Sequence, residues 1–218
     1  MGKELELQRR VIEELDWEPS IDAAHVGVAV TGQNVVTLTG NVSSYAEKIA
    51  AERAAKRVTG VKAVANDLEV RPAFPSQRND TELAKAALNA LEWDIAVPHD
   101  KIKVRVSSGV VALEGEVNFQ FQRSAAEEAV RRLIGVKAVT NLMTLKPTVS
   151  PADIKNRIEA ALRRSAEIDA KNIQVETKDG GVVLRGKVRS WIEREEAERA
   201  AWAAPGVRNV DDELRVGA

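Results

Sequence analysis

The chain contains the stretch Val36-Thr37-Leu38-Thr39-Gly40, in which apolar and polar residues alternate up to a closing glycine. A second glycine, Gly60, follows 20 residues later and precedes a valine. The same Leu-x-Gly and the same interval occur twice more, at Gly115 with Gly135 and at Gly186 with Gly206. Such self-similarity at fixed spacing is the mark of a repeat architecture. The sequence therefore predicts three tandem copies of one small domain.

The spacing of apolar residues around each motif predicts the order αββαβ. Residues four apart form one helical stripe before each motif: Leu7, Val11 and Leu15; Leu83, Ala87 and Leu91; Ile154, Ile158 and Leu162. An alternating pair of runs then predicts a β-hairpin. Alanine-rich helices over about 44–58, 119–133 and 190–204 end at the second glycine, as suits a left-handed helix-terminating residue, and a strand over 61–70 and its counterparts completes each copy.

We therefore expect an α+β fold of three domains, each a three-stranded sheet with two helices packed on one face. The predicted domains are residues 1–71, 79–146 and 150–218. The short linkers between them contain Pro72, Pro75 and Pro147, which stiffen a linker.

Composition excludes several classes of function. With 32 basic and 33 acidic residues there is no overall positive field, so we expect no nucleic-acid partner. Cysteine is absent, which excludes disulfides, thiolate nucleophiles and thiolate zinc sites. No apolar run approaches the roughly 20 residues of a membrane-spanning helix. The first residues lack the apolar core of a secretory signal, so the sequence as it stands predicts a cytoplasmic protein, or a periplasmic one if a signal was removed.

The repeated pattern resembles the BON domain. The resemblance rests on Val-x-Leu-x-Gly at 36–40, 111–115 and 182–186, and on Gly-Val-x-x-Val with Asn or Asp at 60–66, 135–141 and 206–212. At the last position of this motif, Asp212 replaces the asparagine of the other copies. The resemblance implies a non-enzymatic bacterial protein associated with osmotic or envelope stress that contacts phospholipid or an envelope partner. Some members of the family are cytosolic, and one binds potassium.

The residues themselves give no sign of an active site, and we expect neither catalysis nor a cofactor. His25 and His99 occupy no shared position of the repeat and are interpreted as surface residues. A cation site using Asp179, or Asp211 with Asp212, is an alternative compatible with hard-ion chemistry. No metal ligand is predicted, because no spacing resembles a calcium-binding loop. The motif glycines 40, 60, 115, 135, 186 and 206 are interpreted as structural.

Aromatic and basic side chains give the candidate contact residues. Trp17 and Trp93 share one position near the end of the first helix, where they either pack over a domain edge or contact a membrane or partner. Trp191 opens the last helix, and Trp202 stands where the other copies carry a charge, which predicts exposure. Exposed tryptophan on a helix with Arg194 and Arg199 would suit a lipid interface or a protein partner, with packing against a neighbouring repeat as the alternative.

Phe119 and Phe121 stand at the start of the same helix in the second copy. Phe119 aligns with serines and is the predicted exposed anchor, whereas Phe121 aligns with Ala46 and Ile192 and is predicted to be core. Three functions stay open from the sequence: phospholipid or envelope binding with avidity from tandem copies, cytosolic cation sensing, and a protein-interaction scaffold.

Overall fold

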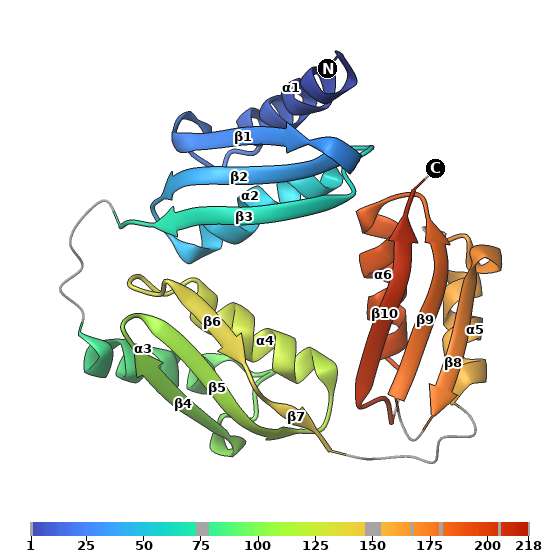
Figure 1. The fold of residues 1–218 in the computed structure, drawn as a ribbon. Coiled ribbons are helices and arrows are strands. Elements are labelled where there is room, and N and C mark those ends of the chain that lie inside the picture. The colour runs from blue at the N-terminus through green and yellow to red at the C-terminus, as the bar shows by residue number, and fades with distance from the viewer. Residues whose placement is uncertain are drawn as a thin grey trace. The chain divides into compact units, whose positions relative to one another are not determined.

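In the computed structural model, which describes residues 2–72, 79–146, 154–166, 168–178, 181–204 and 206–217, the chain forms three small sheets, each with two helices on the same face (Figure 1). The predicted α+β class and the order αββαβ are confirmed. We refer to the part of the fold within residues 2–72 as domain 1, the part within residues 79–146 as domain 2, and the described part from residue 154 onward as domain 3. The predicted proline linkers lie largely outside the described residues.

Domain 1 contains α1 (Gly2–Trp17), the 3₁₀ turn η1 (Ala23–His25), β1 (Val26–Thr31), η2 (Gly32–Asn34), β2 (Val35–Val42), α2 (Tyr45–Arg57) and β3 (Ala63–Val70). The sheet order is β1-β2-β3, with β2 antiparallel to β1 and parallel to β3. Because α2 connects the two parallel strands, it returns across the same face that α1 covers.

Domain 2 repeats this plan with one difference in its third strand. Its elements are α3 (Asp80–Trp93), η3 (His99–Lys101), β4 (Ile102–Ser107), β5 (Val110–Val117), α4 (Gln120–Arg131), β6 (Ala138–Asn141) and β7 (Thr144–Leu145). The single strand that the repeat predicts is split into β6 and β7, both beside β5. The chain still follows β5 across the break, since Leu142 N–H donates to the Leu113 carbonyl at 2.8 Å.

Domain 3 contains α5 (Ile154–Arg164), η5 (Ala170–Asn172), β8 (Ile173–Lys178), β9 (Gly181–Val188), α6 (Trp191–Trp202) and β10 (Asn209–Val216). The strand order is again β10-β9-β8 with the hairpin partner antiparallel and the last strand parallel. Asp179 and Gly180, which separate β8 from β9 in the sequence, lie outside the described residues.

The core of each domain lies between the sheet and its two helices. In domain 1 the predicted stripe Leu7, Val11 and Leu15 is at most 2% exposed and packs with Val36 and Leu38 of the central strand. The second helix contributes alanines, Ala51, Ala54 and Ala55, which have no exposed surface. Small side chains on one helix and leucines on the other let both helices approach one three-stranded sheet.

Gly40 shows why the motif ends in glycine. Its φ of +119° lies in a region that side chains disfavour, and a β-carbon there would overlap the carbonyl oxygen of His25. Gly115 and Gly186 repeat this approach against Lys101 and Asn172. Because glycine has no β-carbon, the backbone that precedes the first strand can lie in close contact with the central strand at this point.

The second helix of domain 1 begins with a variant of the capping box, in which the glutamate accepts from the residue before the N-cap. The Ser44 hydroxyl accepts from Glu47 N–H, and the buried Glu47 carboxylate accepts from the backbone N–H groups of Ser43 and Asp22. Ser190 and Glu193 repeat the arrangement in domain 3. The carboxylate therefore ties the helix start to the loop that follows the first helix.

In domain 2, both the glutamate and the aspartate whose N–H binds it are replaced. Gln122 replaces the glutamate, and Pro98, which has no N–H to donate, stands where the other loops have aspartate. Gln122 Oε1 instead accepts from the N–H groups of Asn118 and Phe119. The second domain thus begins α4 with a neutral cap and an aromatic residue.

Candidate interaction surface

Phe119 and Phe121 form an exposed aromatic pair at the start of α4. Their ring centroids are 5.6 Å apart with an interplanar angle of 14°, a stacked geometry. Phe119 is 47% exposed and Phe121 is 59% exposed. The prediction of an exposed Phe119 agrees with the structure, whereas the prediction that Phe121 is core is wrong.

The reason lies in the register of α4. The buried face of this helix is provided by Ala126 and Val130, which correspond to Ala51 and Ala55 of α2. Phe121 lies in the first turn on a different face, and its counterpart Ile192 is also 49% exposed. The prediction that Phe121 is core failed because Ile192, the apolar residue at the equivalent position of domain 3, is itself on the surface.

Trp17 and Trp93 stand free of their domain cores. They are 82% and 87% exposed at the last residue of α1 and of α3. The interpretation that they pack over the edge of their own domain is wrong, and their surfaces are left to solvent or to a ligand. In domain 2 the apolar surface continues to Ile95, which is fully exposed two residues further on.

The two tryptophans of α6 differ from one another. Trp191 is half-buried, and the Arg194 guanidinium lies 4.9 Å from its ring centroid in a cation–π contact. Trp202 is also half-buried, packs against the domain 3 core, and donates its Nε1–H to Glu198 at 3.2 Å. The prediction that Trp202 is exposed is therefore wrong, since the ring covers the core in place of a charged side chain.

Both predicted arginines are engaged by acids of their own domain. Arg194 Nε donates to Asp212 Oδ2 at 2.6 Å, and Arg199 pairs with Glu196 one turn away on α6. The Glu196 bond raises the pKa of Arg199 and correspondingly lowers that of the glutamate. The arginines thus contribute little net positive charge for an anionic surface.

Acidic and histidine side chains do not converge on a reactive centre in the part of the chain that the structure describes. His25 Nδ1 lies 3.0 Å from Asp22 Oδ2 on the surface. Asp212 forms an ion pair with Arg194. Asp179 lies outside the described residues. Over these same residues no group of three or more His, Asp or Glu is placed to hold a metal ion. Among the described helices, none is both long enough and apolar enough to cross a bilayer.

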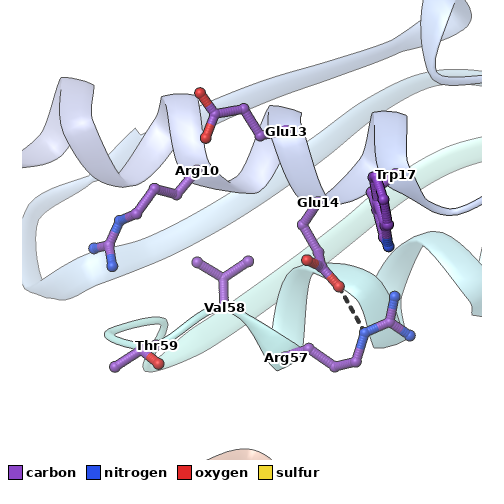
Figure 2. Close-up of a pocket in the computed structure, with 7 residues that line it drawn as sticks. All are labelled: Arg10, Glu13, Glu14, Trp17, Arg57, Val58 and Thr59. Carbon is purple, nitrogen blue, oxygen red and sulfur yellow. Dashed lines mark hydrogen bonds and ion pairs between the residues drawn. The ribbon is translucent and has the colours of Figure 1, made fainter.

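A groove of about 520 Å³ lies between α1 and the end of α2 in domain 1 (Figure 2). Trp17 stands at one end, and the Arg57 guanidinium bonds to Glu14 at 2.8 Å across the space between the helices. Arg57 also bonds to Glu18, the residue after α1, at 3.0 Å. The Glu14 bond is the main factor that raises the pKa of Arg57. The sequence did not predict this groove, because only folding brings the two helices together.

The chain is similar to a known domain family and to a known bacterial protein. The BON domain model matches residues 3–72, 79–147 and 150–218. Osmotically-inducible protein Y of Escherichia coli (strain K12) is 38% identical over 120 residues, which span 53% of this chain and 60% of that protein.

Likeness to solved structures is weak. The C-terminal domain of CdsD, a structural protein of the type III secretion system of Chlamydia trachomatis, is 13% identical with a TM-score of 0.29, covering 97% of this chain and 98% of that one. The periplasmic domain of PrgH is 11% identical with a TM-score of 0.24, covering 95% and 100%. Scores this low carry no information on function. The three family matches together span nearly the whole sequence, and the chain belongs to the BON domain family.

Proposed function

We propose that this protein acts by binding, without chemistry, and that domain 2 attaches it to a phospholipid surface through Phe119 and Phe121. The observation that carries the proposal is the stacked, exposed phenylalanine pair. Domain 1 has Ser44 and Ala46 at these positions, so the fold itself does not require aromatic residues there.

The physical argument is the cost of exposed aromatic surface. Burying exposed apolar surface is favourable by about 25 cal/mol for every Å² that is removed from water. Aromatic rings are enriched at lipid–water interfaces and at protein interfaces. A rigid pair at the end of a helix can enter the interfacial region without unfolding the domain.

Tandem domains would strengthen such a weak contact. Trp17 and Trp93 give domains 1 and 2 each an additional exposed aromatic ring. Linked weak contacts gain affinity from effective concentration when all can engage together. Because the relative from Escherichia coli is named for osmotic induction, we propose that this attachment serves a cell under osmotic stress.

In this proposal, electrostatic attraction to lipid contributes less to binding than the sequence predicted. Arg194 and Arg199 are paired within domain 3, so attraction to anionic lipid is a secondary contribution. The contact should depend on aromatic insertion first. We therefore move the predicted site from the last helix to the start of α4.

Co-sedimentation of the full chain with phosphatidylglycerol-containing vesicles tests this function. The test variant is Phe119→Ser with Phe121→Ala, which installs the residues of domain 1. The matched control is Ile192→Ala, which removes an exposed apolar side chain at the equivalent position of domain 3. We expect the test variant to lose at least ten-fold in the bound-to-free ratio and the control to bind as the parent does. Equal binding by all three proteins would overturn the proposal.

A further inference from the structure

Domains 1 and 2 each end their first helix with an exposed tryptophan between two acidic residues. The sequences at this point are Asp16-Trp17-Glu18 after α1 and Glu92-Trp93-Asp94 after α3. Trp93 is 87% exposed, and Glu92 beside it is exposed as well. A carboxylate at a helix C-terminus opposes the partial negative charge there, and the last turn of α3 has no basic residue. We call Glu92 and Trp93 the tryptophan patch, a surface that a cation would neutralise.

Domain 3 carries the opposite charge at the same place in the fold. Arg163 and Arg164, the last two residues of α5, occupy the positions of Glu92 and Trp93. Both arginines are exposed. The Arg163 guanidinium lies 3.7 Å from a Glu159 carboxylate oxygen, but its side chain is 74% exposed, so this ion pair is weak. We call Arg163 and Arg164 the arginine patch.

Domain 1 shows how an arginine meets such a helix end. Its Arg57 guanidinium bonds to Glu14 at 2.8 Å and to Glu18 at 3.0 Å. Figure 2 shows this guanidinium at the same end of the groove as Trp17. The acidic end of α1 is thus served by an arginine of its own domain.

The corresponding residues of domain 2 are arranged differently. Ala90 stands at the position of Glu14, so one carboxylate of the arrangement is missing. Arg132, the counterpart of Arg57, donates to Glu128 of α4 at 2.7 Å. This arginine is therefore held by its own helix, and the tryptophan patch is left for an arginine from elsewhere.

We infer that the tryptophan patch of one copy binds the arginine patch of a second copy. Guanidinium groups suit this surface, because they bond to carboxylates and also stack on aromatic faces. Arg194, 4.9 Å from the centre of the Trp191 ring, is an example within this chain. One arginine of the pair can lie on the Trp93 ring while the other bonds to Glu92.

The contact has two physical consequences. Because the two patches differ, the contact is heterologous, and a pair of copies still has one patch of each kind free to bind further copies. Association therefore continues beyond a dimer. Because the charges are exposed, salt screens their attraction and weakens the contact.

Sedimentation velocity of the full chain without lipid, at rising protein concentration and at low and high salt, tests the inference. We expect the average sedimentation coefficient to rise with protein concentration at low salt, and to rise less at high salt. A chain that stays monomeric at every concentration overturns the inference.

Two variants locate the contact. Glu92→Gln with Trp93→Ala removes the tryptophan patch, and Arg163→Gln with Arg164→Gln removes the arginine patch. All four side chains are exposed, so the fold is kept. Each variant should weaken self-association at least ten-fold.

The matched control is Asp16→Asn with Trp17→Ala, which changes the equivalent residues of domain 1, where Arg57 is already in place. It should associate as the parent does. Equal weakening by this control, or self-association that neither patch variant weakens, overturns the assignment.

Mixing the two patch variants gives the sharpest result. Each variant keeps the patch that the other lacks, so the mixture should form a one-to-one complex that neither variant forms alone. This complex should not grow further, because its two remaining patches are both removed. A mixture that stays monomeric overturns the pairing of these patches. Lipid is absent and the phenylalanine pair is unchanged, so the outcome is independent of the proposed membrane attachment.

Discussion

Arg194 Nε donates to Asp212 Oδ2 at 2.6 Å, at positions where domain 1 has Lys48 and Asn66. The Asn66 amide donates to the Lys48 carbonyl at 3.1 Å and to the Glu52 carboxylate at 3.2 Å. Asn141 makes the same two bonds in domain 2. In domain 3, aspartate stands in place of this asparagine and forms the ion pair with Arg194. Glu198, the counterpart of Glu52, accepts a hydrogen bond from Trp202 instead.

Asn66→Asp should destabilise domain 1 by about 2 kcal/mol, because it turns a donor into a carboxylate facing Glu52 and a carbonyl group. Asp212→Asn keeps an acceptor for Arg194 and should cost domain 3 about 1 kcal/mol or less. Hydrogen exchange read by mass spectrometry reports each domain separately. Equal losses of stability from the two substitutions would contradict this explanation of why aspartate replaces asparagine in domain 3.

Gly40→Ala should destabilise domain 1 by about 3 kcal/mol or more, since the β-carbon would meet the His25 carbonyl oxygen in a strained conformation. Gly60→Ala should cost only about 1 kcal/mol. Its φ is also positive, at +99°, but the nearest atom to an added β-carbon is 3.7 Å away. Urea denaturation of the two variants measures the difference, and a larger loss for Gly60→Ala would refute the close-approach argument.

Domain 3 should lose stability in acid through Glu193. Burial acts to raise the pKa of this carboxyl, but hydrogen bonds from the backbone N–H groups of Asp169 and Arg189 outweigh it and hold the pKa below its ordinary value of 4.5. A group with a depressed folded-state pKa stabilises the fold above its unfolded pKa, and this stabilisation is lost as the pH falls through the folded value.

Glu193→Gln tests this link with the residue that domain 2 uses naturally. The variant should be less stable than the parent at pH 7 by about 1–2 kcal/mol, and the difference should shrink as the pH falls below 4.5. Denaturation followed by tryptophan fluorescence reports on domain 3 through Trp191 and Trp202. A difference that stays constant from pH 7 to pH 3 would show that the carboxylate charge is not the cause.

Removing the arginine charges should affect stability more than membrane attachment. Arg194→Ala leaves Asp212, which is only 14% exposed, without its ion-pair partner, so domain 3 should melt at a lower temperature. Vesicle binding of Arg194→Ala with Arg199→Ala should remain within about two-fold of the parent, because both charges are already paired. A loss as large as that of the phenylalanine variant would return the site to α6.

The repeat made the fold predictable, but side-chain environments were less so. Glycine spacing and apolar periodicity identified the α-helices and the central hairpins of the described residues, but not the short 3₁₀ helices, because both patterns follow directly from the geometry of regular backbone. They did not reveal that β2 lies between an antiparallel and a parallel neighbour. Strand order depends on how α2 returns over the sheet, which no local pattern encodes.

The candidate site shows the same limit. Phe119 was correctly expected on the surface, since its counterparts are serines that cap a helix. Trp202 was misplaced, because a charged counterpart does not exclude a ring that folds back over the core. Arg194 and Arg199 were identified as basic, but their acidic partners became visible only once the chain was folded.

The most direct test of the central claim is whether the start of α4 enters lipid. The chain has no cysteine, so Ser124→Cys, on exposed surface one turn beyond Phe121, can carry a single nitrobenzoxadiazole label. Glu195→Cys places the same label at the equivalent position of domain 3. With phosphatidylglycerol-containing vesicles, the label at position 124 should brighten and be quenched by nitroxide-labelled lipid, and the label at 195 should not. No change at 124, or equal quenching at both positions, would contradict attachment through Phe119 and Phe121.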